Sequence, residues 1–383
     1  MRMWPVVIVL ALIIIGIAFY FYKFLRRILV TFDINVNQKK VKIGLTIATI
    51  CIGLLCIDIS GIAALTILHI MMLGFICQLL NFIIKKVFKV KYENGLRLWK
   101  KIYGSGIIPI FIAGILIIFG YFNLHNVIET GYTIYTNKNI RSEGYRVVLI
   151  ADVHYGVSLN DEEFTAKCKE ISEADADIVL LCGDIIDDST TKAGMEHVFK
   201  TLGSIKNKLG IFYVYGNHDR PFYSLKYPFS EQDLVKVMAE NGITILKDEI
   251  FEISDDFILV GREDKSRNRN GAGRLTIDTL LSNVNGDSFV LTMDHQPNEY
   301  AENGRAGTDL LVSGHTHGGQ IWPVNFIDKL FKINDAVYGH TKIDGDTEAI
   351  VTSGFAGWSY PIKTAAPAEY VIIDIKKYEE KDK

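Results

Sequence analysis

Long apolar segments occupy the amino-terminal part of the chain, up to about residue 122, and the remainder has the composition of an ordinary soluble domain. Residues 5–22 contain no charged side chain, and a second apolar tract runs from about residue 43 to 84 with an interruption around Asp58. A further uncharged run covers residues 102–123. Because a bilayer core of about 30 Å takes about 20 helical residues, the tract 43–84 suits two helices joined at Asp58. The pattern therefore predicts four membrane spans.

Basic side chains gather in two of the loops between these predicted spans. Those of the first loop are Lys23, Arg26, Arg27, Lys39 and Lys40, and those of the third are Lys85, Lys86, Lys89, Lys91, Arg97, Lys100 and Lys101. The loop between the second and third spans carries only Asp58. Because basic loops stay in the cytoplasm, the chain is predicted to be a multi-pass protein of the cell membrane whose domain after residue 123 is extracytoplasmic. A cleaved signal peptide is the alternative for residues 5–22, but no small-x-small cleavage site precedes the first basic cluster.

From residue 146 onward, short apolar runs without alternation are each followed by glycine and polar residues. These runs cover residues 146–150, 178–182, 211–215, 289–293 and 309–312. Continuous apolar runs of this length are typical of strands buried on both faces. Helical patterns follow the first two runs, over residues 161–174 and about 192–206. The chain is therefore predicted to have two domains, a helical membrane domain over residues 1–123 and an α/β domain over residues 124–383.

Each predicted strand ends in a cluster of chemically capable side chains. The clusters are Asp152 and His154, Asp184 and Asp187, Asn217 with His218 and Asp219, Asp294 and His295, and His315 with His317. Taken alone, each has a simpler interpretation as an ordinary turn, since glycine-aspartate pairs such as Gly183 and Asp184 are common there. However, five of the nine histidines fall in these clusters, and open α/β sheets bind ligands at the carboxyl ends of their strands. The clusters are therefore predicted to form one site.

The predicted site contains the donors of a metal centre. Carboxylates, an amide oxygen and neutral imidazoles, without thiolates, suit divalent manganese, iron, cobalt, nickel or zinc. The donors are more numerous than one ion needs, which favours two divalent ions with a carboxylate between them. In two-metal hydrolases the ions stand about 3.5 to 4 Å apart, generate hydroxide and clamp an in-line displacement at phosphorus. The glycines of residues 314–320 would let backbone and substrate approach closely.

In this order, the motifs DVH, GDIID, GNHD, DHQP and GHTH resemble the calcineurin-like metallophosphoesterase superfamily over residues 145–375. The segments GGQIWP and VTSGFAG, with Pro361 after them, are similar to the bacterial membrane-associated phosphodiesterases of the YkuE and YaeI type. The resemblance implies a four-layer α/β/β/α sandwich with two facing sheets, and phosphoester hydrolysis with two divalent ions. Relatives often have arginine two residues after the proline, where this chain has Lys363. That departure concerns a substrate contact rather than the metal site.

The resemblance also implies a role for each motif residue. The ligands of one ion are Asp152, His154 and His317. Those of the other are Asn217, His295 and His315, and Asp184 bridges the two ions. His218 and Asp219 are implied to be the catalytic pair, with His218 beside the phosphoryl group and Asp219 orienting it.

A short loop over residues 261–274 concentrates positive charge. Its basic side chains are Arg262, Lys265, Arg267, Arg269 and Arg274. Two interpretations stay open for this loop. It is either a solvated charged loop or a binding site for an anionic substrate or lipid headgroup, because arginine is well shaped for bidentate contacts with phosphate. On the second interpretation, Arg262, Arg267 and Arg269 are the candidate substrate-binding residues.

We expect a membrane-anchored dinuclear phosphoesterase that uses metal-activated hydroxide on phosphodiester bonds or on lipid- or envelope-linked phosphates. Its substrate would be a phosphorylated small molecule or a lipid. One alternative is the same chemistry on soluble nucleotides or phosphodiesters. The other is a non-catalytic metal-binding membrane sensor or scaffold, against which His218 and Asp219 argue because metal binding alone does not require them.

Charge and cysteine content exclude two further classes. The net charge of -3 gives no overall sign of a nucleic-acid binder, so no nucleic-acid partner is expected. Five cysteines without a CxxC pair predict no disulfide framework. The sequence gives no indication of the oligomeric state.

Overall fold

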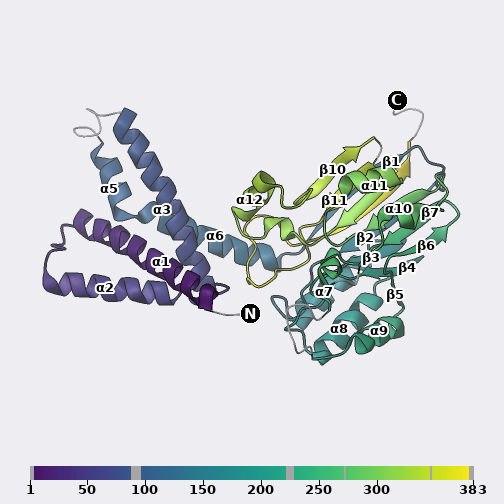
Figure 1. The fold of residues 1–383 in the computed structure, drawn as a ribbon, viewed down its shortest axis with the longest axis horizontal. Helices are drawn as coiled ribbons and strands as arrows, with labels where there is room; N and C mark the ends of the chain where they lie inside the picture. The colour runs from purple at the N-terminus through teal and green to yellow at the C-terminus, as the bar shows by residue number, and fades with distance from the viewer. Residues whose placement is uncertain (1–3, 88–95, 221–227, 271–272, 346, 379–383) are drawn as a thin grey trace. The chain divides into compact units, whose positions relative to one another are not determined.

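The computed structural model describes residues 4–87, 96–220, 228–270, 273–345 and 347–378 of the 383-residue chain. Contacts divide the chain into two compact units, Met1–Phe119 and Gly120–Lys383 (Figure 1). We call them the helical unit and the soluble unit, and each is described separately.

The helical unit contains the predicted apolar segments. Its helices are α1 (Trp4–Thr31), α2 (Lys39–Leu54), α3 (Ile62–Val87), α5 (Arg97–Ser105) and the first residues of α6 (Ile107–His125). The aromatic side chains of Tyr20, Phe21 and Phe24 form a core with Ala64 and Ile67 of α3. Many large apolar side chains outside this core are exposed. Large exposed apolar surfaces of this kind mark contact with lipid or with other proteins.

Three helices of the described residues are long and apolar enough to cross a membrane: Val7–Thr31, Ile62–Val87 and Ile107–His125. All four predicted segments are helical, and the break predicted at Asp58 falls between α2 and α3. However, α2 has only 16 residues. At 1.5 Å per residue it is about 24 Å long, shorter than a bilayer core of about 30 Å. The predicted count of four spans is therefore approximate.

Within the described part of the soluble unit, the strands form two six-stranded sheets. The first has the spatial order β1 (Ile128–Thr136), β12 (Glu369–Lys377), β2 (Tyr145–Ile150), β3 (Ile178–Cys182), β4 (Gly210–Val214) and β5 (Ile243–Ile245). The second has the order β10 (Gly339–Asp344), β11 (Thr347–Val351), β9 (Leu310–Ser313), β8 (Phe289–Met293), β7 (Phe257–Gly261) and β6 (Glu249–Ser254). Strands β2 to β5 are parallel, as are β7, β8, β9 and β11. The apolar runs predicted as buried strands are β2, β3, β4, β8 and β9.

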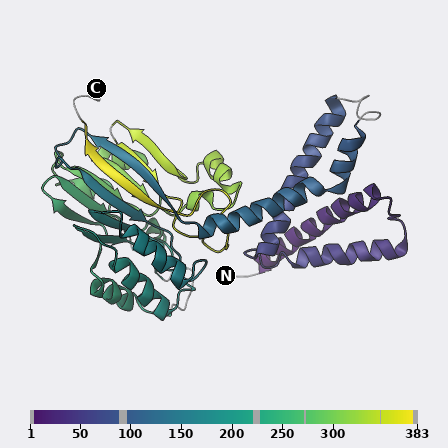
Figure 2. The same ribbon diagram turned by 180° about the vertical axis from the view of Figure 1, so that it is seen from behind.

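Four layers stack in the soluble unit (Figure 2). Because successive side chains of a strand point to opposite faces, Val148 and Ile150 of β2 pack with the helices while Val147 and Leu149 face the second sheet. The helices over the first sheet are α7 (Asp161–Ile171), α8 (Lys192–Gly203) and α9 (Glu231–Glu240), and those over the second are α10 (Ile277–Leu281) and α11 (Tyr300–Ala306). This order confirms the α/β/β/α sandwich that the resemblance implies.

The end of α6 is part of the soluble unit. The Asn123 side chain donates hydrogen bonds to the carbonyl oxygens of Lys363 and Ala366, at 2.9 and 2.8 Å. The backbone N–H of Lys363 donates to the carbonyl oxygen of Gly120 at 3.0 Å. The boundary between the two units defined by contacts lies between residues 119 and 120. The change in composition predicted a domain boundary between residues 123 and 124.

Candidate metal centre

The predicted ligands lie in five loops, each of which follows a strand. These are the loops after β2 (Asp152 and His154), β3 (Asp184), β4 (Asn217), β8 (His295) and β9 (His315 and His317). The backbone N–H of His315 donates to both carboxylate oxygens of Asp152, at 2.9 Å each, and so links a loop of the second sheet to one of the first. Within the first sheet, the N–H of Asp152 donates to the carbonyl oxygen of Gly183 at 3.0 Å. The facing edges of the two sheets therefore form one site.

Asp152, His154 and His317 form the first group of donors. Their ligand atoms all lie within 4.8 Å of one another, and all three residues are buried. The Nε2 atoms of His154 and His317 are 3.1 Å apart, and Nε2 of His317 lies 3.6 Å from Oδ1 of Asp152. This is the set that the resemblance implies for one ion.

Asp184, His295 and His315 form the second group, whose ligand atoms also lie within 4.8 Å of one another. Oδ2 of Asp184 is 3.1 Å from Nε2 of His295 and 3.7 Å from Nε2 of His154. A single carboxylate oxygen therefore faces a donor of each group. A ligand that bridges two ions needs this position.

Asn217 supplies an unpaired oxygen. Its Oδ1 is buried and has no hydrogen-bond partner among the described residues. An unpaired buried amide oxygen costs free energy, which a bound cation would recover. The next residue, His218, donates its backbone N–H to Oδ1 of Asp184 at 2.7 Å, so Asn217 lies beside the second group. The residues present therefore fit a divalent ion.

Hydrogen bonds on the outer side of the rings orient the imidazoles. Nδ1 of His295 lies 2.8 Å from the carbonyl oxygen of Cys182, and Nδ1 of His317 lies 3.3 Å from that of Ala356. Because a carbonyl oxygen can only accept, these Nδ1 atoms carry the proton, and a neutral ring then has its lone pair on Nε2. Such partners fix the tautomer of metal-binding histidines. When neutral, both rings would present the lone pair of Nε2 to the centre.

Burial and charge set the protonation of these groups. Burial raises the pKa of Asp152 to about 6, although His295 opposes the shift. Burial also acts to raise the pKa of Asp184, but the imidazoles of His295 and His154 outweigh it and bring the pKa well below its usual value. Burial, together with His154, lowers the pKa of His317 well below its usual value. An ionised Asp184 and a neutral His317 are the forms that bind metal ions.

Five of the seven predicted ligands have a backbone conformation that is rare outside glycine. Their φ angles are 55° at Asp152, 41° at His154, 52° at Asp184, 72° at His315 and 50° at His317. Each such residue costs about 1–3 kcal/mol and is typical of functional sites. Glycines allow the close packing: a Cβ at Gly314 would lie 2.5 Å from Oδ2 of Asp152, and one at Gly216 would lie 2.1 Å from Oδ1 of Asp184.

His218 lies at the edge of the centre, and the carboxylate of Asp219 accepts backbone N–H groups of two neighbouring loops. The His218 ring packs 5.1 Å from the His154 ring and 5.2 Å from the Trp358 ring, between centroids. Burial lowers the pKa of His218, although Asp184 opposes the shift. The carboxylate of Asp219 accepts the backbone N–H groups of Asp184, at 2.7 Å, and of Gly216, at 2.6 Å. Asp219 therefore holds the loops that carry Asp184 and Asn217.

Asp187 is a further candidate site residue, whose role its motif alone did not indicate. It is buried, and its Oδ2 lies 3.0 Å from Nδ1 of His154 and 3.6 Å from Nδ1 of His218. Although burial acts to raise the pKa of Asp187, the hydrogen bond with His154 lowers it, so the side chain is ionised at neutral pH. The signal was the GDIID motif, which puts a second aspartate at the same strand end as Asp184.

Arg262, one of the candidate substrate contacts, is buried rather than exposed in its loop. The Arg262 side chain is 0% exposed, and it pairs with Glu299 at 3.5 Å and Asp248 at 3.7 Å. The side chain is therefore not solvated, and its contact with a substrate phosphate stays a prediction. The side chain of Arg274, from the same loop, is 2% exposed and pairs with Glu299 at 2.7 Å and with Asp294, the neighbour of His295, at 3.0 Å.

The other two candidate substrate contacts remain predictions. Arg267 is half-buried in a short 3-10 helix, η1 (Lys265–Asn270), and its backbone N–H donates to the carbonyl oxygen of Asp264 at 3.1 Å. The side chain of Arg269 lies outside the described residues.

Lys363 binds a loop that packs against the predicted ligand Asp152. Its ammonium group is buried and donates to the carbonyl oxygens of Ser353 and of Gly354, the latter at 3.1 Å. Burial lowers the pKa of Lys363 to about 7. A Cβ at Gly354 would lie 2.7 Å from Cβ of Asp152, so this loop packs directly on a predicted ligand.

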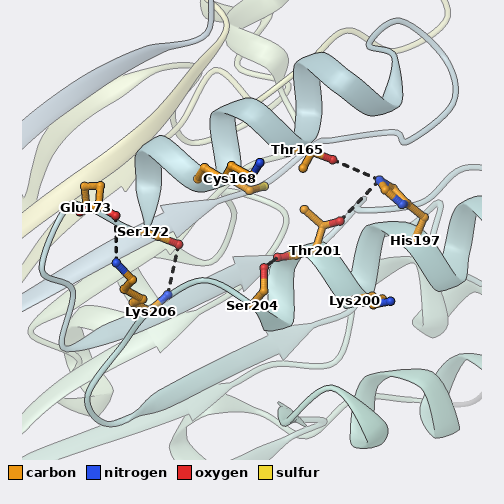
Figure 3. Close-up of a pocket in the computed structure, with 10 residues that line it drawn as sticks. Thr165, Cys168, Ser172, Glu173, His197, Lys200, Thr201, Ser204 and Lys206 are labelled. Atoms are coloured by element: carbon orange, nitrogen blue, oxygen red, sulfur yellow. Dashed lines mark hydrogen bonds and ion pairs between the residues drawn. The ribbon is translucent and has the colours of Figure 1, made fainter.

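A groove of about 440 Å³ between α7 and α8 is separate from the metal centre (Figure 3). Its side chains pair with one another: Nε2 of His197 lies 3.3 Å from Oγ1 of Thr165, and Lys206 pairs with Glu173 at 2.9 Å. None of the predicted ligands is among the described residues that line it.

Comparison with known proteins gives consistent matches. Residues 145–319, which contain all five motifs, match the sequence model of the family described as Calcineurin-like phosphoesterase. An uncharacterized metallophosphoesterase of Helicobacter pylori is 28% identical over 225 residues, which are 58% of this chain and 58% of the relative. The chain therefore spans little more than half the length of that relative. A transmembrane protein with metallophosphoesterase domain from Danio rerio is 25% identical over 244 residues, 61% of this chain and 54% of the relative.

The metallophosphoesterase YkoQ of Bacillus subtilis is 30% identical over 200 residues, which are 49% of this chain and 68% of YkoQ. About two thirds of YkoQ is thus matched by about half of this chain. On these matches, which agree with the site geometry, the chain belongs to the calcineurin-like phosphoesterase family.

Proposed function

We propose that this protein is a membrane-anchored phosphoesterase that hydrolyses phosphoester bonds with two divalent metal ions. One ion would be held by Asp152, His154 and His317, and the other by Asn217, His295 and His315, with Asp184 between them. The observation that carries the proposal is the position of Asp184 Oδ2, 3.1 Å from His295 and 3.7 Å from His154. A site for a single ion does not require a carboxylate oxygen that faces both groups of donors.

Two divalent ions bound here would supply Lewis acidity at the phosphoryl oxygens and a nucleophile at neutral pH. The side chains around them have separate tasks. Asp187 holds Nδ1 of His154, and Asp219 holds the backbone of Asp184 and Gly216. Both are positioning residues, since each acts through a ligand.

We assign the transfer of a proton to the departing oxygen to His218. Its ring lies beside the His154 ring, with Asp187 Oδ2 3.6 Å from Nδ1. The negative charges of Asp187 and of a bound phosphoryl group both favour the protonated imidazole, against the effect of burial. A general acid placed in this way contributes about 10² to 10⁴ in rate.

We propose lipid-linked or envelope phosphodiesters as the substrate class, since three apolar helices would hold the enzyme at a membrane. We also propose that the soluble unit is extracytoplasmic. Because α3 is long and apolar enough to cross a membrane, the basic loops after α1 and after α3 lie on one side of it only if α2 crosses as well. The proposal therefore requires α2 to cross despite its 16 residues.

The proposal is tested by turnover of the full-length protein in detergent or lipid nanodiscs. Stripped protein is reloaded with manganese, cobalt, nickel, iron or zinc and assayed on bis(p-nitrophenyl) phosphate, a nucleotide monophosphate and a phospholipid. We expect hydrolysis that a chelator abolishes and that Asp184→Asn removes. Asp175→Asn is the matched control, because that side chain is 80% exposed and pairs only with a surface lysine, Lys208, among the described residues. Metal binding without turnover of any phosphoester would favour the sensor or scaffold instead.

A further inference from the structure

Helix α12 (Val324–Phe331) exposes its apolar side chains and buries a polar one. Phe326, Leu330 and Phe331 are 62%, 76% and 70% exposed. The buried side chain of the helix is Asp328, whose carboxylate accepts the backbone N–H and the side-chain amide of Asn334, at 3.2 and 2.9 Å. Surface helices of soluble proteins normally turn their apolar stripe toward the core. An exposed apolar face of this kind indicates an interaction surface.

Hydrogen bonds within the soluble unit connect α12 to the end of α6. Two residues before the helix, the backbone N–H of Trp322 donates to Oγ1 of Thr364 at 2.9 Å. Lys363, the residue before Thr364, donates its backbone N–H to the carbonyl oxygen of Gly120 in α6. The carbonyl oxygen of Lys363 accepts a hydrogen bond from the side chain of Asn123, also in α6. The start of α12 therefore lies one short loop away from the last turns of α6.

The same end of the unit is apolar and basic. Tyr121 and Phe122 of α6 are 50% and 66% exposed. Lys329 and Lys332 beside the apolar residues of α12 are also exposed. Exposed aromatic and aliphatic side chains flanked by lysine are typical of helices that lie in the interface of an anionic bilayer. Because α6 is long and apolar enough to cross a membrane, its last turns lie where a bilayer surface would be.

We propose that α12 docks its apolar face into the surface of the bilayer that holds the apolar helices, with Lys329 and Lys332 at the lipid headgroups. The helix contacts the short turn η2 (His317–Gly319). A Cβ at Gly319 would lie 2.5 Å from the backbone nitrogen of Asn325, so the turn that begins at the predicted ligand His317 packs closely on α12. Docking would therefore hold the metal centre at headgroup level, within reach of a lipid-borne phosphate. The inference rests on the membrane anchoring in the proposed function but not on hydrolysis.

The test places a fluorophore on α12 of the full-length protein in anionic nanodiscs. A Cys51→Ala background removes the exposed cysteine, and Leu330→Cys is labelled with a nitrobenzoxadiazole probe. Val235→Cys on α9, which is 41% exposed, is the matched control at an exposed apolar position. We expect a blue-shifted emission at residue 330 that brominated lipids quench, and neither effect at residue 235. Equal emission at the two positions, without quenching, would overturn the proposal.

The alternative to the bilayer is that a second copy of the chain binds to the apolar face of α12. In that case probes at residue 330 would quench one another in nanodiscs that hold two copies, with no effect of brominated lipids, and bilayer docking would be wrong. A functional arm uses the double variant Leu330→Ser with Phe331→Ser. It should keep the wild-type turnover of bis(p-nitrophenyl) phosphate and lose turnover of a phospholipid in vesicles, whereas Val235→Ser should lose neither. If the wild type hydrolyses no phosphoester, the proposed phosphoesterase activity is wrong. The quenching experiment still decides whether α12 docks on the bilayer.

Discussion

The imidazoles of His154 and His317, 163 residues apart in the chain, face each other with their Nε2 atoms 3.1 Å apart. Nδ1 of each ring faces an oxygen, of Asp187 and of Ala356 respectively. If both rings were neutral, they would direct two lone pairs at the same point. That arrangement is unfavourable unless a proton or a cation lies between them.

Metal loading should therefore stabilise the protein. With free ion at 100 times Kd, one site stabilises the folded state by about 2.7 kcal/mol. We expect manganese or zinc to raise the thermal midpoint of the detergent-solubilised full-length protein in scanning fluorimetry. His317→Ala should lose most of the shift, whereas His197→Ala, in the groove between α7 and α8, should keep it. If neither metal changes the thermal midpoint of the wild-type protein, metal binding at this site is contradicted.

Removal of Asp187 should weaken metal binding without removing a ligand. Its Oδ2 holds Nδ1 of His154 at 3.0 Å, and loss of such a partner typically costs 10- to 100-fold in affinity or activity. Asp187→Ala should therefore need about 10 to 100 times more metal for half-maximal activity. Metal titrations of turnover measure this, with Asp175→Ala as the exposed control. An unchanged titration would show that Asp187 does not position His154.

The role of His218 predicts a dependence on the leaving group. Because a nitrophenolate leaves without protonation, His218→Asn should lose about 10² to 10⁴ in rate on an alkyl phosphodiester and much less on a nitrophenyl ester. The variant should keep both metal ions, whereas His317→Ala should lose metal as well. Rates on the two esters, with metal content measured in parallel, check this. Equal losses on both esters would exclude acid catalysis by His218.

Lys363 should make the stability depend on pH. Its pKa in the folded protein is about 7, against 10.5 for an ordinary lysine. Between these two values the unfolded chain binds more protons than the folded one, so the free energy of unfolding should rise as the pH rises from 7 toward 10.5. Lys363→Met should flatten this rise. Urea unfolding of the metal-free protein at pH 7 and pH 9 measures the slope, and an equal slope in both proteins would refute the account.

Labelling of single cysteines in intact cells should decide the topology. Asp287, in the loop before β8, is exposed, and Asp287→Cys in the Cys51→Ala background should react with an impermeant thiol reagent. Asn37→Cys, in the basic loop after α1, should react only after permeabilisation. If the two positions exchange this behaviour, the soluble unit is cytoplasmic. If both react from the same side, α2 does not cross the membrane.

The positions of the candidate ligands could be predicted from the sequence because each lies in a loop that follows an uninterrupted apolar run. In β2 both faces are buried, so the strand has no polar residue after Arg146 until Asp152. The local sequence pattern did not predict that loops of the two sheets lie next to each other. This arrangement depends on contacts such as that between His315 and Asp152, which lie 163 residues apart, and only the family resemblance implied it.

Other features depend on distant partners that no local pattern reveals. The basic segment around Arg262 left a solvated loop and an anion-binding site both open, because its partners Asp248 and Glu299, which pair with the buried side chain, lie in other loops. The roles of Asp219 and Lys363 likewise follow from backbone groups brought together by the fold. The exposed face of α12 is a third case, because its amphipathic pattern does not indicate which side faces the solvent.

The claim that two ions share Asp184 is tested most directly by electron paramagnetic resonance of the manganese-loaded full-length protein. At full loading we expect two manganese ions per chain and the spectrum of an exchange-coupled pair, and Asp184→Asn should replace it with the six-line signal of isolated ions. Full turnover with one ion per chain, or with two ions that show no coupling, would contradict the account.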